Sequence, residues 1–199
     1  MSGPLTAAVV AALFLCSLTA GFLFAFAVVV MPGIEALDDP AYLRAFQVMD
    51  GVIQANQPLF MLMWIGSIVA MLAVLVLGVG NASGVVRLLV VGAAVLYLGG
   101  VQLPTVLVNI PLNDRVQSVG VDELDATSAR TARAAFEPRW NRWNVIRTGV
   151  AIVSVSMLLA ALSSSFARLP PPDRRLQHEE LGEVLRGQEP HQRPRGQHG

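Results

Sequence analysis

The chain has 199 residues, of which 54% are hydrophobic and only 14% charged, and its formal net charge at pH 7 is zero. Soluble domains usually carry about 25% charged residues, so this composition excludes a water-soluble globule and predicts an integral membrane protein. The zero net charge gives no support to nucleic-acid binding.

Four apolar stretches predict membrane-spanning helices. They cover residues 5–31, 58–79, 88–108 and 145–162, and each is long enough, or nearly so, to cross about 30 Å of hydrocarbon at about 1.5 Å per residue. The fourth is the shortest and contains Arg147, which must reach the interface or find a partner. We therefore expect an all-α, membrane-embedded four-helix bundle formed by residues 1–165.

The first stretch is expected to be a retained helix and not a cleaved signal peptide. Residues 1–4 contain no Lys or Arg, and the apolar run is much longer than the 7–15 residues usual for a signal peptide. Within this helix, Ala8, Ala12, Cys16 and Ala20 recur every four residues, which indicates a seam where a neighbouring helix can approach closely.

Cysteine and histidine are scarce. Cys16 is the single cysteine, so an intrachain disulfide is excluded. The three histidines, His178, His191 and His198, all lie in the C-terminal tail. The predicted spans therefore lack the side chains of a haem, iron or zinc centre, and we expect no cofactor.

Two of the three connections are long and polar. They comprise residues 32–57 and 109–144, whereas residues 80–84 form a short turn. With four spans, both long connections must lie on one membrane face, and the termini and the short turn on the other. Each face receives seven arginines; Arg168, Arg174 and Arg175 directly follow the last span, which favours cytoplasmic termini in a multi-pass protein of the cell membrane.

The C-terminal tail, residues 166–199, is poor in apolar residues and rich in Pro, Gln and charge. Such a composition cannot bury enough apolar surface to offset the entropy of ordering. We expect this tail to be disordered.

The first long connection contains an amphipathic helix. Asp39 followed by Pro40 is typical of a helix start, and two faces follow: Leu43, Phe46, Met49 and Ile53 are apolar, whereas Arg44, Gln47, Asp50, Gln54 and Gln57 are polar. Such a helix either lies in the headgroup region with its polar side in water, or covers a cavity with that polar side.

The end of the third span is interrupted by prolines. Pro104 predicts a kink or a freed backbone carbonyl, and Pro111 predicts the end of the helix. Asn109 and Asn113 then lie near the interface, where their amides need hydrogen-bond partners. Helix capping or interhelical hydrogen bonding explains these two asparagines as well as ligand binding does.

The start of the fourth span carries the most specific pattern. Trp140, Trp143, Asn144 and Arg147 follow at i, i+3, i+4 and i+7 and thus share one helical face. An interfacial aromatic belt explains the tryptophans alone. An arginine inside a span needs a partner, and Asp50 and Glu35 are the carboxylates that the first connection can supply; a structural ion pair and a functional site both fit.

These motifs resemble those of the anthrone oxygenase-like family of small membrane proteins. The resemblance covers roughly residues 5–165 and rests on Pro32-Gly33, Asn56, Asn109-x-Pro111-x-Asn113 and Trp140-x-x-x-Asn144-x-x-Arg147. It implies the chemistry attributed to fungal members, the oxidation of polyketide anthrones to anthraquinones by molecular oxygen. Most bacterial members have no assigned function.

With no flavin, nucleotide or intramembrane histidine motif, the implied reaction is a cofactor-independent monooxygenation. Asp50 or Glu35 would be the base, and Arg147 would stabilise an enolate. The substrate-binding residues would be Asn56, Asn109, Asn113, Trp140, Trp143 and Asn144. The alternative is a non-enzymatic protein that binds a lipid or hydrophobic small molecule or stabilises a membrane complex. Membrane lipids are the expected surroundings, and homo-oligomerisation stays open.

Overall fold

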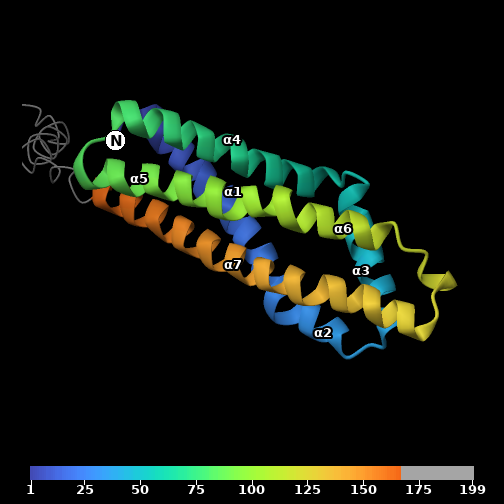
Figure 1. Ribbon diagram of the computed structural model, residues 1–199. Coiled ribbons are helices and arrows are strands. Elements are labelled where there is room, and N and C mark those ends of the chain that lie inside the picture. Colours follow the sequence, from blue (N-terminus) through green and yellow to red (C-terminus); the bar gives the residue numbers. More distant parts are fainter. Residues whose placement is uncertain (167–199) are drawn as a thin grey trace, which may run out of the picture. The chain divides into compact units, whose positions relative to one another are not determined.

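The computed structural model describes residues 1–166, and these residues contain helices and no strand. Four continuous helices are long and apolar enough to cross a membrane: Gly3–Glu35, Pro58–Asn81, Gly84–Gln117 and Ala126–Ser165. The prediction of an all-α, four-helix, multi-pass membrane protein is therefore confirmed (Figure 1). The predicted disorder of the tail concerns residues that lie outside the described part of the chain.

The helices are subdivided by short π-helical turns. In chain order the elements are α1 (Gly3–Ala25), η1 (Phe26–Val30), α2 (Met31–Glu35), α3 (Asp39–Gln54), α4 (Pro58–Asn81), α5 (Gly84–Tyr97), η2 (Leu98–Gln102), η3 (Thr105–Asn109), α6 (Ile110–Gln117), the 3-10 turn η4 (Val121–Glu123) and α7 (Ala126–Phe166).

The bundle core is built from small residues and aliphatic side chains. α1 packs against α4 and α7, and α5 packs against α4 and α7. Ala12, Cys16 and Ala20 are buried, as the seam on the first helix predicts. At Gly100 of η2, an added Cβ would lie 2.8 Å from the Val150 side chain, so this glycine allows η2 and α7 to approach closely.

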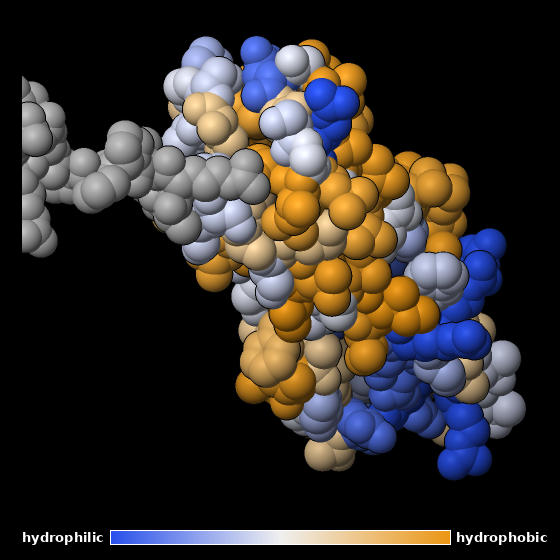
Figure 2. Space-filling model, turned by 90° about the vertical axis from the view of Figure 1, so that its left-hand side faces the viewer, coloured by the Kyte–Doolittle hydropathy of each residue, from blue (hydrophilic) through white to orange (hydrophobic). Residues whose placement is uncertain are grey.

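The outside of the bundle is apolar. Leu59, Val76 and Leu88 are each 70% or more exposed, and Figure 2 shows a hydrophobic band over the middle of one face with hydrophilic residues toward its ends. Exposed apolar surface of this extent is stable where it faces lipid.

A second apolar core lies at the end of the bundle opposite the N-terminus and the α4–α5 turn (Figure 1). We call this region the cap; it consists of α2, α3, α6, η4 and the part of α7 up to and including Trp140. Its core is formed by Met31, Tyr42, Leu43, Phe46, Leu112, Val116, Val121, Ala129, Phe136 and Trp140. The apolar face of the predicted amphipathic helix is therefore packed against protein, and α3 covers the end of the bundle.

The α3 helix begins one residue earlier than its sequence indicates. The side chain of Asp38, and not that of Asp39, accepts the capping hydrogen bond from the Ala41 amide at 2.9 Å. Asp39 instead faces α7, where its carboxylate lies 3.3 Å from Arg133.

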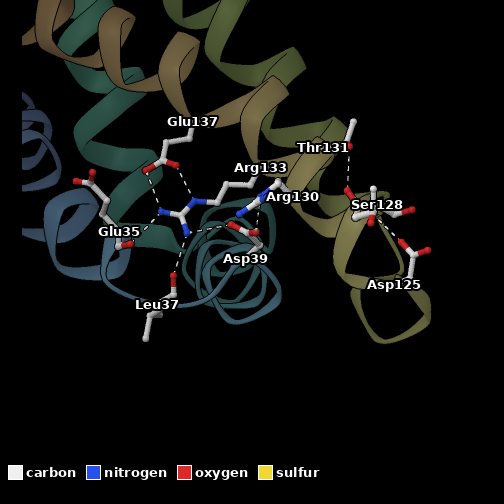
Figure 3. Close-up of polar contacts among 10 residues, drawn as sticks. Glu35, Leu37, Asp39, Asp125, Ser128, Arg130, Thr131, Arg133 and Glu137 are labelled. Atoms are coloured by element: carbon white, nitrogen blue, oxygen red, sulfur yellow. Dashed lines mark hydrogen bonds and ion pairs between the residues drawn. The ribbon is translucent and has the colours of Figure 1, made fainter.

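Arg133 joins the first connection to α7 (Figure 3). Its guanidinium donates to the Glu137 carboxylate at 2.7 Å and to the backbone carbonyls of Glu35 and Leu37 at 2.9 Å each. It also lies 4.2 Å from the ring centroid of Tyr42, a cation–π distance. Burial raises the pKa of the Tyr42 hydroxyl, so this ring stays neutral beneath the guanidinium.

Each π-helical turn ends two residues before a proline: Pro32, Pro104 and Pro111. The residue preceding each proline donates its backbone N–H to the carbonyl five residues back. Proline has no N–H and its ring clashes with the carbonyl four residues back, and the wider turn accommodates it. The helix consequently continues through Pro111 into α6, and the prediction that Pro111 ends it was wrong.

The alternation of four helices predicts opposite sides for neighbouring connections. With Cys16→Ala as background, cysteines introduced by Ser83→Cys and Asp122→Cys should react with a membrane-impermeant maleimide from opposite sides of the membrane, because one span separates them. Labelling of intact cells and of inverted vesicles measures this. Reaction of both cysteines from the same side would contradict the four-span topology.

Candidate functional site

A partly open cavity of about 120 Å³ lies between the bundle core and the cap core. Six of the nine predicted site residues line it: Asp50, Asn109, Asn113, Trp140, Asn144 and Arg147. Most of the remaining lining is apolar, with the aromatic rings of Phe22, Phe26, Phe46, Phe60, Trp64 and Trp140 around it. Because an apolar cavity of about 150 Å³ can hold benzene, this one encloses roughly one ring, and a polycyclic ligand would extend into the opening.

Arg147 is only 4% exposed and its hydrogen-bond partners are neutral. It donates from Nη1 to the Thr105 hydroxyl at 2.7 Å and from Nη2 to the Asn144 amide oxygen at 3.1 Å. Among residues 1–166, no carboxylate lies within ion-pair distance of it. The expected pairing of Arg147 with Asp50 or Glu35 is therefore not found, and its charge is buried without a protein counter-charge.

Asp50 is also buried, at 4% exposure, and amide groups satisfy most of its carboxylate. Asn113 donates to Oδ1 at 2.7 Å, and Gln117 and Gln54 donate to Oδ2 at 3.0 and 2.9 Å. Since a carboxylate can accept about four hydrogen bonds, one lone pair on Oδ1 is left. Glu35, the other predicted base, is exposed and does not line the cavity, because Arg133 holds its backbone on the outside of the cap.

The asparagines have separate roles. Asn113 connects Trp140 to Asp50, since its Oδ1 accepts from Trp140 Nε1 at 2.8 Å. Asn144 donates to the Leu23 carbonyl at 3.1 Å and thereby joins α7 to α1. Asn56 is exposed and adopts a left-handed conformation (φ 58°) just after α3, where it ends the helix.

Trp143 is half-buried and does not line the cavity. It follows Trp140 by three residues, so its side chain lies about 60° from that of Trp140 around the helix axis, on the side away from Asn144, and it is not among the lining residues. Of the predicted substrate-binding residues, Trp143 and Asn56 are thus the two that the structure places elsewhere.

Several cavity residues were not predicted, and the third span supplies the most informative of them. Gln102 and Thr105 line the cavity together with Asn109, at i, i+3 and i+7 of one helix, a polar face within an otherwise apolar segment. That periodicity is visible in the sequence. Trp64 is also new; it donates from Nε1 to Gln102 Oε1 at 2.7 Å.

Four polar atoms of the lining have no hydrogen-bond partner among the described residues although they are buried. They are Gln102 Nε2, Asn109 Nδ2, Asn109 Oδ1 and Arg147 Nε. Buried polar groups are normally paired, so unpaired groups gathered in one cavity indicate a place for a polar ligand atom. No group of three or more His, Cys, Asp or Glu side chains lies together in residues 1–166.

These features define a multi-pass α-helical membrane protein with a mainly aromatic and apolar cavity, lined also by several polar side chains, where the bundle meets its cap. The family model for anthrone oxygenases matches residues 57–157, just over half of the chain, and the chain belongs to that family. The match runs from α4 into α7 and includes Asn109, Trp140, Asn144 and Arg147. No curated protein and no solved structure matches the chain.

Proposed function

We propose that this protein is a cofactor-independent oxygenase that acts on a hydrophobic phenolic or anthrone-like substrate. The family membership and the membrane-capable helices support this proposal. The observation that carries it is that a carboxylate, Asp50, and a cation, Arg147, line the same aromatic cavity without forming an ion pair.

The proposed reaction uses these two groups in sequence. Asp50 accepts a proton from the activated carbon of the substrate through the free lone pair of Oδ1, and Arg147 stabilises the negative charge that develops on the enolate oxygen. The electron-rich enolate then reduces molecular oxygen. The CH₂ group of the anthrone and O₂ give the carbonyl of the quinone and one water molecule, so that atoms and electrons balance.

The aromatic rings supply binding and exclude water. Phe26 and Phe46 lie 5.9 and 5.5 Å from Trp140 between ring centroids, and Phe22 lies 5.3 Å from Phe60. These edge-to-face and tilted contacts hold the rings in place, and further aromatic contacts of the same kind can bind an aromatic ligand. A cavity with few waters strengthens the interaction of Arg147 with an oxyanion.

Replacing Asp50 by asparagine should lower oxygen uptake with anthrone by about 100-fold or more, because general base catalysis contributes about 10²–10⁴-fold. An oxygen electrode and chromatographic detection of anthraquinone measure the rate, with heat-inactivated protein as the measure of autoxidation. Asp114→Asn is the matched control, since Asp114 is exposed and does not line the cavity. An Asp50→Asn variant with unchanged turnover would remove Asp50 from the mechanism.

The second candidate is non-enzymatic binding of a hydrophobic small molecule. It is favoured by the three amide donors that already hold the Asp50 carboxylate. In that case anthrone or a related aromatic compound should raise the thermal stability of the protein, while oxygen uptake stays at the level of the heat-inactivated sample.

A further inference from the structure

Three side chains that line the cavity carry hydrogen-bond donors without a partner among the described residues. Gln102 is 7% exposed, Asn109 2% and Arg147 4%, and each carries at least one buried N–H group without a partner among the described residues. Leaving a buried donor unpaired destabilises the folded protein. Three of them lining one cavity indicate that a ligand acceptor completes the site.

The local fold selects which atoms are left free. Trp64 occupies Gln102 Oε1 and leaves Nε2 unpaired. Thr105 and Asn144 occupy the two terminal nitrogens of Arg147 and leave Nε. In both side chains the neighbours fix the orientation and leave a single donor atom without a partner, which is how preorganised sites are built.

The same helix presents both amides through a repeated pattern. Gln102-Leu-Pro104 and Asn109-Ile-Pro111 are two amide-x-proline sequences seven residues apart, and each amide is the last residue of a π-helical turn. Turns of this kind are frequent at functional sites. The prolines therefore have a role beyond kinking the helix, because the turns that accommodate them end at the two amide residues.

The buried charge of Arg147 indicates which charge the ligand carries. A buried guanidinium with only neutral partners is costly because its hydration is lost and no counter-charge replaces it. Among the unpaired atoms, three are donors and one, Asn109 Oδ1, is an acceptor. Asp50 is the other charged group of the lining, but it forms no ion pair with Arg147 and three amide groups already donate to its carboxylate. A ligand that brings a negative charge on an oxygen atom satisfies the excess of donors and supplies the counter-charge that Arg147 lacks.

We propose that Arg147, Asn109 and Gln102 form an oxyanion subsite and that the cavity holds its aromatic ligand preferentially in the ionised form, as a phenolate or as the enolate that proton transfer to Asp50 gives. This inference rests on the proposed function for the class of ligand and adds its ionisation state and two binding residues. The aromatic lining favours a phenolate over the carboxylate of a fatty acid, which shares the charge but not the flat shape.

A hydroxyanthraquinone dye tests the subsite without any oxygen chemistry. Such a dye is stable to oxygen, and its neutral and ionised forms differ in colour. In detergent-purified protein at a pH one unit below the pKa of the free dye, the free dye is about one-tenth anion. A preference of about 10- to 1,000-fold for the anion should make at least about half of the bound dye anionic, which its spectrum shows. Oleate, added as a competitor, should displace it weakly.

Variants separate the contributions. Arg147→Gln should abolish the preference for the anion, and Arg147→Lys should restore part of it because the charge returns without the planar donor group. Gln102→Leu and Asn109→Leu should each weaken anion binding about tenfold, as loss of a hydrogen bond to a charged group does. Arg87→Gln is the matched control, since Arg87 is exposed and lies near the α4–α5 turn.

The outcomes distinguish this proposal from the proposed reaction. Binding of the neutral dye with equal or greater affinity, retention of the anion preference in Arg147→Gln, or no binding at all would overturn the subsite. Displacement by oleate at equal affinity would assign the subsite to lipid carboxylates. Anion binding combined with no oxygen uptake from anthrone would support the subsite and reject the oxygenase.

Discussion

Replacing Arg133 by glutamine is expected to lower the free energy of unfolding by about 2–4 kcal/mol. The Arg133 side chain is 14% exposed and that of Glu137 is 17% exposed, so the variant leaves a largely buried carboxylate without its cation. It also loses the donors to the carbonyls of Glu35 and Leu37 and the contact with the Tyr42 ring. Chemical unfolding in mild detergent, followed by tryptophan fluorescence, measures the change.

A neighbouring arginine supplies the control. Arg130 lies one turn earlier on α7, its side chain is 83% exposed, and it approaches Asp39 only to 3.9 Å. Exposed ion pairs contribute about 0–1 kcal/mol, so Arg130→Gln should leave stability nearly unchanged. Equal effects of the two substitutions would mean that the cap is held by its apolar core and that Arg133 contributes only surface charge.

The bundle could be predicted from the sequence because hydropathy and length determine it. The four apolar stretches correspond to the four membrane-capable helices, and parity alone placed both long connections together. The face that carries Trp140, Asn144 and Arg147 followed from helical periodicity, and these three residues do line one cavity. These features depend on the local residue pattern and on the need to cross a membrane. Both can be recognised in a single sequence.

The cap could not be predicted in the same way. Residues 126–144 were interpreted as connection, because Arg130, Arg133, Arg139 and Arg142 make this segment hydrophilic, yet they form the first half of α7. Their burial partners come from α3 and α6, which are distant in the sequence. A helix that packs against protein on one side and faces water on the other is not apolar enough to be recognised as a membrane span.

The contacts of individual side chains could not be predicted from the sequence either. Asp50 and Glu35 were equal candidates, and the fold separates them because Asp50 is on the inner side of α3 whereas Glu35 is outside. Asn56 was interpreted as a ligand residue, yet its positive φ gives it a sufficient role at the end of α3. Small differences in backbone conformation determine where such side chains lie, and the periodicity of the sequence does not predict these differences.

Arg147 leads to the opposite expectation from Arg133. Arg147→Gln should raise the free energy of unfolding of the ligand-free protein by about 1–3 kcal/mol, since neutral replacements of buried charges are often stabilising by this amount. Glutamine keeps a donor within reach of Thr105 or Asn144, so little hydrogen bonding is lost. Arg147→Lys should give no gain, because it keeps the buried charge.

The gain in stability should come with a loss of binding. Groups that are costly in the free protein and useful in the complex are typical of functional sites, and Arg147→Gln should no longer bind the ionised dye. The same unfolding assay, with and without dye at a pH where the dye is ionised, measures both effects: the dye should stabilise the wild type and have little effect on Arg147→Gln. If Arg147→Gln instead destabilises the ligand-free protein as much as Arg133→Gln does, the guanidinium is a structural element of the bundle. The oxyanion subsite would then lose its energetic basis, because the charge would already be compensated without a ligand.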